Sequence, residues 1–425
     1  MTHVLIIGGG IAGPVTAMAL RKAGIGATVY EAYPVGADDV GAFLVLFNNG
    51  LEALRTIGAH QPVLDAAFPA GSVELFSAEG ELIAERPASG TRDEDGAGVL
   101  GPHTLKRAAL YRVLHDEAAR RGVDVQHGKR LTGAETLPDG RVTARFADGT
   151  SATGDLLLGA DGLHSTVRGL LDPHAPRPRH TGQITVCGYA RGLSPELSPA
   201  VGTYRMLHGK RAFLGCTRAP DGEVWWFANT PGEEMSREEL AAVTAGEWRE
   251  RLRALFAEDG TPAAAVVGAS GEGIVGSNAY DIARTPVWHS GPLAVLGDAA
   301  HAAAPNAGQG ASMAIEDGVV LAKCLRDLPH PEGAFAAYEH LRRERVERLV
   351  RQSAQLNAHA VHGPERAAPE KAGPGKSVPE EGVPEERAAG ERAAGDRPPG
   401  GTSTWLTHYR IAWDEPVAPA PLNRP

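Results

Sequence analysis

The chain of 425 residues is 42% hydrophobic and has a formal net charge of −10 at pH 7. This composition is typical of a globular protein with one large domain or two domains of ordinary size. The folded region has no cluster of five or six Lys or Arg residues, so the acidic balance argues against nucleic acid or an anionic membrane surface as a partner. Chemistry on a small molecule is favoured instead.

The three cysteines are Cys187, Cys216 and Cys324, which are odd in number and far apart. This pattern predicts unpaired buried thiols in a reducing compartment rather than a disulfide framework, and it predicts no metal site. The apolar stretch 4–20 has no basic residues before it, contains four glycines and is shorter than the roughly 20 residues of a membrane span. We therefore expect a cytoplasmic protein.

The first thirty residues predict a βαβ unit, with a strand over 4–7, a helix over 11–23 and a second strand over 27–30. Gly8, Gly10 and Gly13 lie between the first strand and the helix in the spacing G-x-G-x-x-G. Each glycine has its own reason: a tight turn, close approach of a pyrophosphate, and close packing of helix on strand. The N-terminus of the helix, at Ile11 and Ala12, offers N–H groups to phosphates.

Glu31 ends the second strand, where an acid accepts hydrogen bonds from the ribose hydroxyls of an adenosine. Its negative charge disfavours a 2′-phosphate, so we expect the adenosine of NAD or FAD rather than that of NADP.

Helical patterns follow over 43–70 and over 104–122. Arg107 lies near the start of the second helix and away from its apolar face, where a cation is unfavourable for the helix dipole. Either a ligand holds this arginine or it is solvated. Short alternating runs over 123–158 then predict an antiparallel meander.

A second motif begins with the apolar run 156–158, continues through a turn containing Asp161 and leads into a helix near His164. An acid at the carboxyl end of a parallel strand lies at the rim where doubly wound folds bind ligands. Asp-Gly is also a common turn sequence, so a structural role stays open.

Residues 181–230 are strand-like and rich in aromatic side chains, most of which we expect to pack in the sheet. The candidates for contact with a flat substrate are Tyr189, Tyr204, Arg205, Phe213 and Trp226. Further helices are expected over 237–256, 310–325 and 332–357.

The third motif, "PLAVLGDAAHAAAPNAGQG", places Asp298 directly after an apolar strand and glycines before a long helix. The acid suits hydroxyl groups, and the N–H groups of the helix N-terminus suit an anion. A reduced flavin with its ribityl chain meets both requirements, whereas a nicotinamide dinucleotide does not.

Together, "GGGIAG…YEA", "GADGLHSTVR" and "GDAAHAAAPNAGQGASMAIEDG" resemble the FAD-dependent aromatic hydroxylases of the para-hydroxybenzoate hydroxylase class, the group A flavoprotein monooxygenases. The resemblance covers residues 3–357. It implies an α/β fold in which a Rossmann-like FAD-binding domain carries an inserted, mainly antiparallel β-sheet substrate domain and C-terminal helices.

The resemblance also implies roles for individual residues. The residues that would bind the ADP part of FAD are Gly8, Gly10, Ile11, Ala12, Gly13 and Glu31. Arg107 would contact the flavin, and Asp298 would bind the ribityl chain. Asp161 lies in the signature that the family links to NAD(P)H use. The segment beside the isoalloxazine ring contains Pro305, Gly308, Gln309, Gly310 and Ala311. His301 is interpreted as structural, with a catalytic base as the alternative.

The implied reaction is reduction of FAD by NADPH or NADH, which binds transiently, then formation of a flavin C4a-hydroperoxide with O₂ and transfer of one oxygen to an aromatic small molecule. The Ala-, Gly- and Arg-rich composition is typical of a GC-rich bacterial source, which favours a role in specialised metabolism. A monomer or a homodimer is expected. A Baeyer–Villiger oxygenase and an FAD-dependent reductase are the alternatives on the same scaffold. A non-catalytic flavin-binding protein is the alternative that differs most from a monooxygenase.

The predicted division of the chain assigns 1–70, 98–180 and 286–325 to the FAD-binding domain, 71–97 and 181–285 to the substrate domain, and 326–362 to a C-terminal helix. Residues 363–402 contain no aromatic residue and no Leu or Ile, which predicts a disordered linker. Residues 403–425 regain Trp405, Tyr409 and Trp413. They are expected to dock onto the folded body or onto another subunit.

Overall fold

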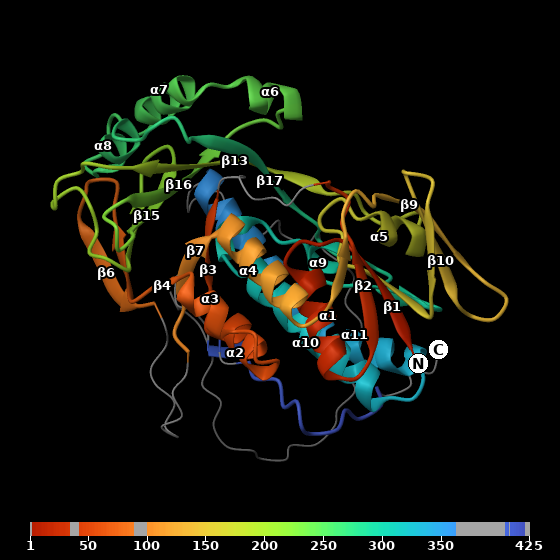
Figure 1. Ribbon diagram of the computed structural model, residues 1–425. Coiled ribbons are helices and arrows are strands. Elements are labelled where there is room, and N and C mark those ends of the chain that lie inside the picture. The colour runs from red at the N-terminus through yellow and green to blue at the C-terminus, as the bar shows by residue number, and fades with distance from the viewer. Residues whose placement is uncertain (1, 35–41, 89–99, 363–403, 408, 421–425) are drawn as a thin grey trace, which may run out of the picture.

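The computed structural model describes residues 2–34, 42–88, 100–362, 404–407 and 409–420 (Figure 1). The predicted linker 363–402 lies outside the described residues.

A six-stranded sheet, here called sheet A, forms one half of the molecule, with the strand order β18-β19-β12-β1-β2-β8. Its strands are β1 (His3–Ile7), β2 (Gly26–Tyr30), β8 (Asp124–Gln126), β12 (Leu156–Gly159), β18 (His289–Ser290) and β19 (Leu293–Val295). All neighbours are parallel except β18 and β19. The central strands β1 and β12 are apolar on both faces and buried, as the covered strands of a parallel sheet must be.

Sheet C is seven-stranded, in the order β17-β13-β16-β15-β14-β5-β6, and only its β14–β5 pair is parallel. Its strands are β5 (Ser72–Phe76), β6 (Leu82–Pro87), β13 (Arg179–Ala190), β14 (Thr203–His208), β15 (Phe213–Arg218), β16 (Val224–Pro231) and β17 (Val275–Asp281). One face carries α6 (Arg237–Ala242), α7 (Ala245–Leu255) and α8 (Ala263–Gly268), as Figure 1 shows. The opposite face turns toward the rest of the molecule.

Two three-stranded sheets complete the β-structure. They are β3 (Phe43–Leu46), β7 (His103–Lys106) and β4 (Phe68–Pro69), and β9 (Leu131–Thr136), β10 (Val142–Phe146) and β11 (Ser151–Gly154). The helical prediction is wrong at residues 43–46 and 104–106, which pair as β3 and β7. The predicted antiparallel meander is also wrong at β8, which instead pairs in parallel with β2 in sheet A. In each case, pairing with a segment distant in the chain overrides the local pattern.

The predicted helix over 237–256 is two helices, α6 and α7. Each begins with a capping box, Ser236 with Glu239 and Thr244 with Glu247, so the chain restarts a helix at Thr244.

The remaining helices pack around sheet A or lie beside it. They are α1 (Ala12–Lys22), α2 (Asn48–Thr56), α3 (Gln61–Asp65), α4 (Arg107–Arg120), α5 (Thr166–Leu171), α9 (Asp298–His301), the 3₁₀ turn η1 (Pro305–Ala307), α10 (Gly310–Asp327), α11 (Pro331–His362) and α12 (Thr404–Thr407). Helix α10 packs against α1, α2 and α11 and is the central helix of this half. In the described ranges, no helix is long and apolar enough to cross a membrane.

The three cysteines are free and buried, as expected. Within the described part of the chain, no group of His, Cys, Asp and Glu residues is arranged to hold a metal ion.

Candidate active site

Four loops converge at one edge of sheet A because β1, β2, β12 and β19 are parallel and all end there. Gly8 follows β1, Glu31 follows β2, Asp161 lies just beyond β12, and Asp298 lies just beyond β19. The three separated sequence motifs are thus brought to one edge of one sheet.

The glycine turn after β1 has almost no room for side chains. Gly8 has φ of +103°, and a Cβ there would lie closer than 3.0 Å to the backbone of Ala160. A Cβ on Gly13 would overlap the carbonyl oxygen of Gly8. Around Gly10, in contrast, a Cβ would meet nothing within 4 Å. Gly8 and Gly13 are therefore required by the fold, whereas Gly10 borders open space at the start of α1.

Glu31 is buried beside this turn. Its carboxylate accepts hydrogen bonds from the backbone N–H of Gly9, at 2.6 Å, and from that of Tyr33, at 2.9 Å. Each oxygen keeps a further lone pair for a hydroxyl donor. His115 of α4, which the sequence analysis did not select, donates from Nε2 to the carbonyl oxygen of Gly9 at 2.5 Å. Burial lowers the pKa of this imidazole.

Asp161 caps a helix in the structure. Its carboxylate accepts from the hydroxyl of Ser165 at 2.5 Å and from the backbone N–H groups of Thr166 and Val167 at 2.8 and 3.1 Å. Burial raises the pKa of Asp161, against the effect of these hydrogen bonds. These contacts fix the start of α5, and a direct cofactor contact of Asp161 stays a prediction.

Asp298 has the opposite surroundings. It is exposed at the first residue of α9, and among the described residues it makes no hydrogen bond or ion pair. Its Oδ1 lies 3.9 Å from where a Cβ on Gly310 would be, so the acid adjoins the N-terminus of α10. Gly308, with φ of +64°, ends η1 and turns the chain into that helix. A hydroxyl-bearing ligand and an anion would meet suitable partners side by side here.

His301 is held on the other side of this loop. Its Nε2 lies 2.5 Å from Oδ2 of Asp317, which also accepts from the backbone N–H of Gly297 at 2.9 Å. Arg342 donates from Nε to Oδ1 of Asp317 at 2.7 Å. Although burial opposes ionisation of Asp317, His301 and Arg342 hold its pKa below the usual range. His301 is 5% exposed, and these contacts are those of a structural residue.

The loop before α10 reaches sheet C through Asn306. The Oδ1 of Asn306 accepts from the side-chain amide of Asn229 at 2.9 Å, and its Nδ2 donates to Oε1 of Gln183 at 3.3 Å. Asn306 belongs to η1, while the other two side chains come from β16 and β13. This bridge was missed in the sequence because single amide side chains carry no motif. It joins the inner face of sheet C to the loop beside Asp298.

Strand pairing identifies which candidates share that inner face. Tyr189 lies opposite Trp225, and Phe213 lies opposite Asn229. Phe213 and Phe227 are 5.8 Å apart between ring centres, and Phe227 also contacts Phe43 at 6.0 Å. Tyr189 and Phe213 therefore remain candidates, and Phe227, which was not predicted, joins them.

The prediction is wrong for Arg205 and Trp226, which lie on the other face of sheet C. Trp226 is fully buried under α7 and α8 and donates from Nε1 to the hydroxyl of Ser270 at 2.8 Å. Arg205 pairs with Glu74 at 2.9 Å. Strand residues alternate between faces, so the neighbours Tyr204 and Arg205 cannot both face a substrate.

Tyr204 is on the inner face but is not available to a ligand. It is 3% exposed, and its hydroxyl is 2.8 Å from that of Thr104. Arg107 is the exposed first residue of α4, and the described residues show no partner for its guanidinium. Its contact with a flavin stays a prediction.

Comparison with known proteins identifies the class. A family model described as "FAD binding domain" matches residues 1–353, so the chain belongs to this family. It is an FAD-dependent monooxygenase of the aromatic hydroxylase class, as the sequence resemblance predicted. The α/β fold predicted for that class is confirmed as well.

Two relatives and one solved structure illustrate the similarity. The chain is 33% identical over 364 residues to aurachin C monooxygenase/isomerase of Stigmatella aurantiaca, covering 83% of this chain and 88% of that protein. It is 34% identical over 398 residues to a 3-amino-4-hydroxybenzoate 2-monooxygenase of Streptomyces platensis, covering 86% and 91%. Klebsiella pneumoniae HpxO complexed with FAD and uric acid has a TM-score of 0.75 at 26% identity, covering 86% and 90%.

Proposed function

We propose that this enzyme uses NADPH or NADH and O₂ to hydroxylate an aromatic or polycyclic small molecule in specialised metabolism. The observation that carries the proposal is the Asn306 bridge, because it sets the aromatic inner face of sheet C against the loop that starts α10. Relatives named for aurachin C and for 3-amino-4-hydroxybenzoate support an aromatic substrate.

The residues at the edge of sheet A fit FAD. The space beside Gly10 admits a pyrophosphate, and Glu31 keeps lone pairs for ribose hydroxyls. Asp298 has no described partner and would accept from the ribityl hydroxyls. We assign the ring to the segment containing Pro305, Gly308, Gly310 and Ala311. Bound there, FAD supplies the redox chemistry with O₂ and NAD(P)H.

The protein's part in the reaction is positioning and electrostatics. The N–H groups at the start of the 18-residue helix α10 stabilise negative charge on the ring. Phe213 and Phe227 orient a flat substrate and exclude water from it, and Tyr189 lies at the far end of the same face. No side chain is assigned as a general base.

The division into two functional parts is proposed on the same grounds. Residues 1–70, 98–180 and 286–325 supply sheet A and its loops, and 71–97 and 181–285 supply sheet C. A cytoplasmic setting is proposed from the three buried free cysteines.

The test measures NADH and NADPH oxidation by the FAD-loaded protein with a panel of phenols, indoles and polycyclic aromatics, followed by product mass. If the enzyme is a hydroxylase, a substrate should accelerate the oxidation of NADH or NADPH. The product should contain one additional oxygen atom and keep its rings intact. Ring expansion would instead establish the Baeyer–Villiger alternative. Turnover without O₂ consumption would establish the reductase, and no stimulation by any compound would contradict this substrate class.

A further inference from the structure

The C-terminal segment described at 404–407 and 409–420, here called the tail, packs against α10 and α11. Its three large aromatic rings each lie over a cation of the folded body. The distances from ring centre to guanidinium are 4.1 Å for Trp405 and Arg348, 4.4 Å for Tyr409 and Arg345, and 4.6 Å for Trp413 and Arg326. The tail is therefore attached mainly to α10 and α11.

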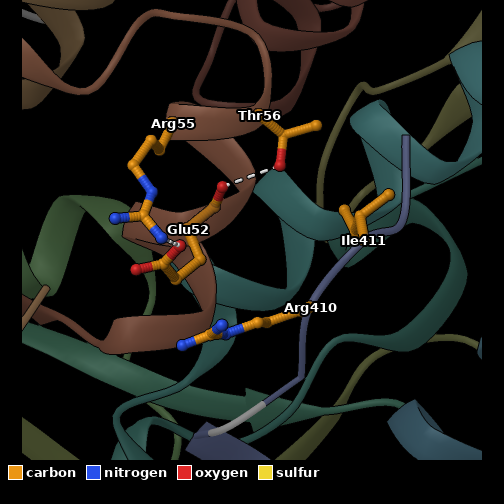
Figure 2. A pocket seen from close by; sticks show the side chains of 5 residues that line it. All are labelled: Glu52, Arg55, Thr56, Arg410 and Ile411. Atoms are coloured by element: carbon orange, nitrogen blue, oxygen red, sulfur yellow. Dashed lines mark hydrogen bonds and ion pairs between the residues drawn. The ribbon is translucent and has the colours of Figure 1, made fainter. Parts of the chain in front are cut away.

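On its other side, α12 of the tail contacts α2, and two hollows lie beside the residues that follow. One hollow, of about 280 Å³, is lined by Glu52, Arg55 and Thr56 on α2 and by Arg410 and Ile411 on the tail (Figure 2). A second hollow of about 340 Å³ continues along the tail as far as Glu415.

Arg345 of α11 joins the tail to the interior. Its guanidinium donates to the carbonyl oxygens of Trp405 and Leu406 at 2.5 and 2.7 Å. The same group donates to both carboxylate oxygens of Glu316, each at 2.9 Å. Glu316 lies on α10, is fully buried and also pairs with Arg342.

Glu316 in turn orients Asn49 at the start of α2. An ionised carboxylate only accepts hydrogen bonds, so Asn49 must turn its NH₂ group toward Glu316. Its Nδ2 lies 2.5 Å from Oε1 of Glu316 and 3.3 Å from Oε1 of Gln309. The carbonyl end of the Gln309 amide is thereby held as an acceptor.

Gln309 lies between Gly308 and Gly310 as the N-cap residue of α10, and it is 1% exposed. With its carbonyl oxygen bound to Asn49, its NH₂ group faces the other way. Nε2 has no partner among the described residues. Because a buried donor without a partner is energetically costly, we expect a ligand to supply a hydrogen-bond acceptor for Nε2.

We propose that the tail is a positioning element of the flavin site. Through Arg345, Glu316 and Asn49 it fixes the polarity of the Gln309 amide and presents Nε2 as a hydrogen-bond donor to the flavin ring. This inference rests on the proposed placement of the ring beside residues 305–311. The tail, although distant in the chain from residues 305–311, thereby influences the environment of the flavin ring.

Two substitutions on α11 form a matched pair. Arg345→Gln and Arg348→Gln each remove a guanidinium near the Trp405 ring, but only Arg345 contacts Glu316. In the full-length protein, we expect Arg345→Gln to weaken FAD binding about tenfold, within the range of measured couplings between sites. It should also change the flavin absorption spectrum and the midpoint potential. Arg348→Gln should change FAD affinity by less than twofold and leave the absorption spectrum and the midpoint potential unshifted.

A truncation ending at residue 403 tests the tail itself. It should reproduce the loss of FAD affinity seen with Arg345→Gln. The truncation combined with Arg345→Gln should add little, because both interrupt one path. Melting of the apoprotein is measured in parallel, so that a variant that does not fold is recognised and the matched pair decides.

The outcomes separate this inference from the proposed function. If the unaltered protein fails to bind FAD, the placement of the flavin is wrong. If it binds FAD and the two arginine variants behave alike, or the folded truncated chain keeps the original affinity and spectrum, the tail is only structural and the inference is overturned.

Discussion

The carboxyl edge of sheet A and the inner face of sheet C both border the candidate site, but their side chains are constrained in different ways. At the edge of sheet A, each proposed cofactor-binding role belongs to one residue at one strand end, such as Gly8 in its turn or Asp298 beside α10. On sheet C, the proposed substrate-binding role is shared by a surface of aromatic and amide side chains, including Phe213 and Asn229. In the proposed site, cofactor binding depends on backbone geometry, whereas substrate binding depends on the face of the sheet to which each strand residue points.

The largest expected effect tests the two faces of sheet C with adjacent residues. Trp226→Ala empties a fully buried position and should lower the free energy of unfolding by about 3–5 kcal/mol. The kcat and KM of the protein that still folds should change little. Phe227→Ala should instead raise KM or alter the products, with a smaller loss of stability. Urea unfolding and substrate-dependent kinetics measure both, and equal effects on KM would contradict the assignment of faces.

The next effect separates the two kinds of glycine in the first turn. Gly8→Ala places a Cβ against the backbone of Ala160 at a positive φ, so we expect a loss of about 3 kcal/mol in unfolding free energy. Gly10→Ala meets nothing in the protein and should leave the apoprotein stable while weakening FAD binding. Melting of the apoprotein and FAD titration distinguish them. Unchanged FAD affinity in Gly10→Ala would place the pyrophosphate elsewhere.

Removing the charge of Asp298 should affect the cofactor without affecting the fold. Asp298→Asn should lose a charge-assisted hydrogen bond to the ribityl chain, worth about 1.5–3 kcal/mol, which weakens FAD affinity roughly 10- to 160-fold. The stability of the apoprotein should stay within about 0.5 kcal/mol, because the side chain is exposed and has no described partner. A stability loss with intact FAD binding would show a structural role instead.

The smallest effect concerns pH and the attachment of the tail. Although burial opposes it, hydrogen bonds from Arg326 and Lys323 lower the pKa of Asp327 from 3.8 to about 2, and Asp327 also accepts from the backbone N–H of Val417. The ionised form is thus favoured by folding. Its stabilisation is complete above pH of about 4 and is lost as the pH falls toward 2. Urea unfolding across this range should show a shallower pH dependence in Asp327→Asn, and identical slopes would contradict the assignment.

Much of the nucleotide-binding half was predictable because its signals are local. The G-x-G-x-x-G spacing and an apolar strand followed by an acid specify a turn and its neighbours within a few residues. Strand β3 and the end of β7 were missed because their pairing partners are distant in the chain. The two capping boxes at Ser236 and Thr244 were visible in the sequence and would have divided the helix correctly.

By itself, the sequence determined the class of protein, the strand ends that carry the cofactor motifs and the aromatic character of sheet C. Only the tertiary structure decided that Trp226 is covered by helices while Phe227 lies on the face toward the candidate site, because both faces of β16 are largely buried and alternation alone cannot say which is inside. It also decided that Asn306 meets Asn229 and that Arg345 connects the tail to Glu316. Such contacts depend on how distant segments pack, and no local pattern encodes them.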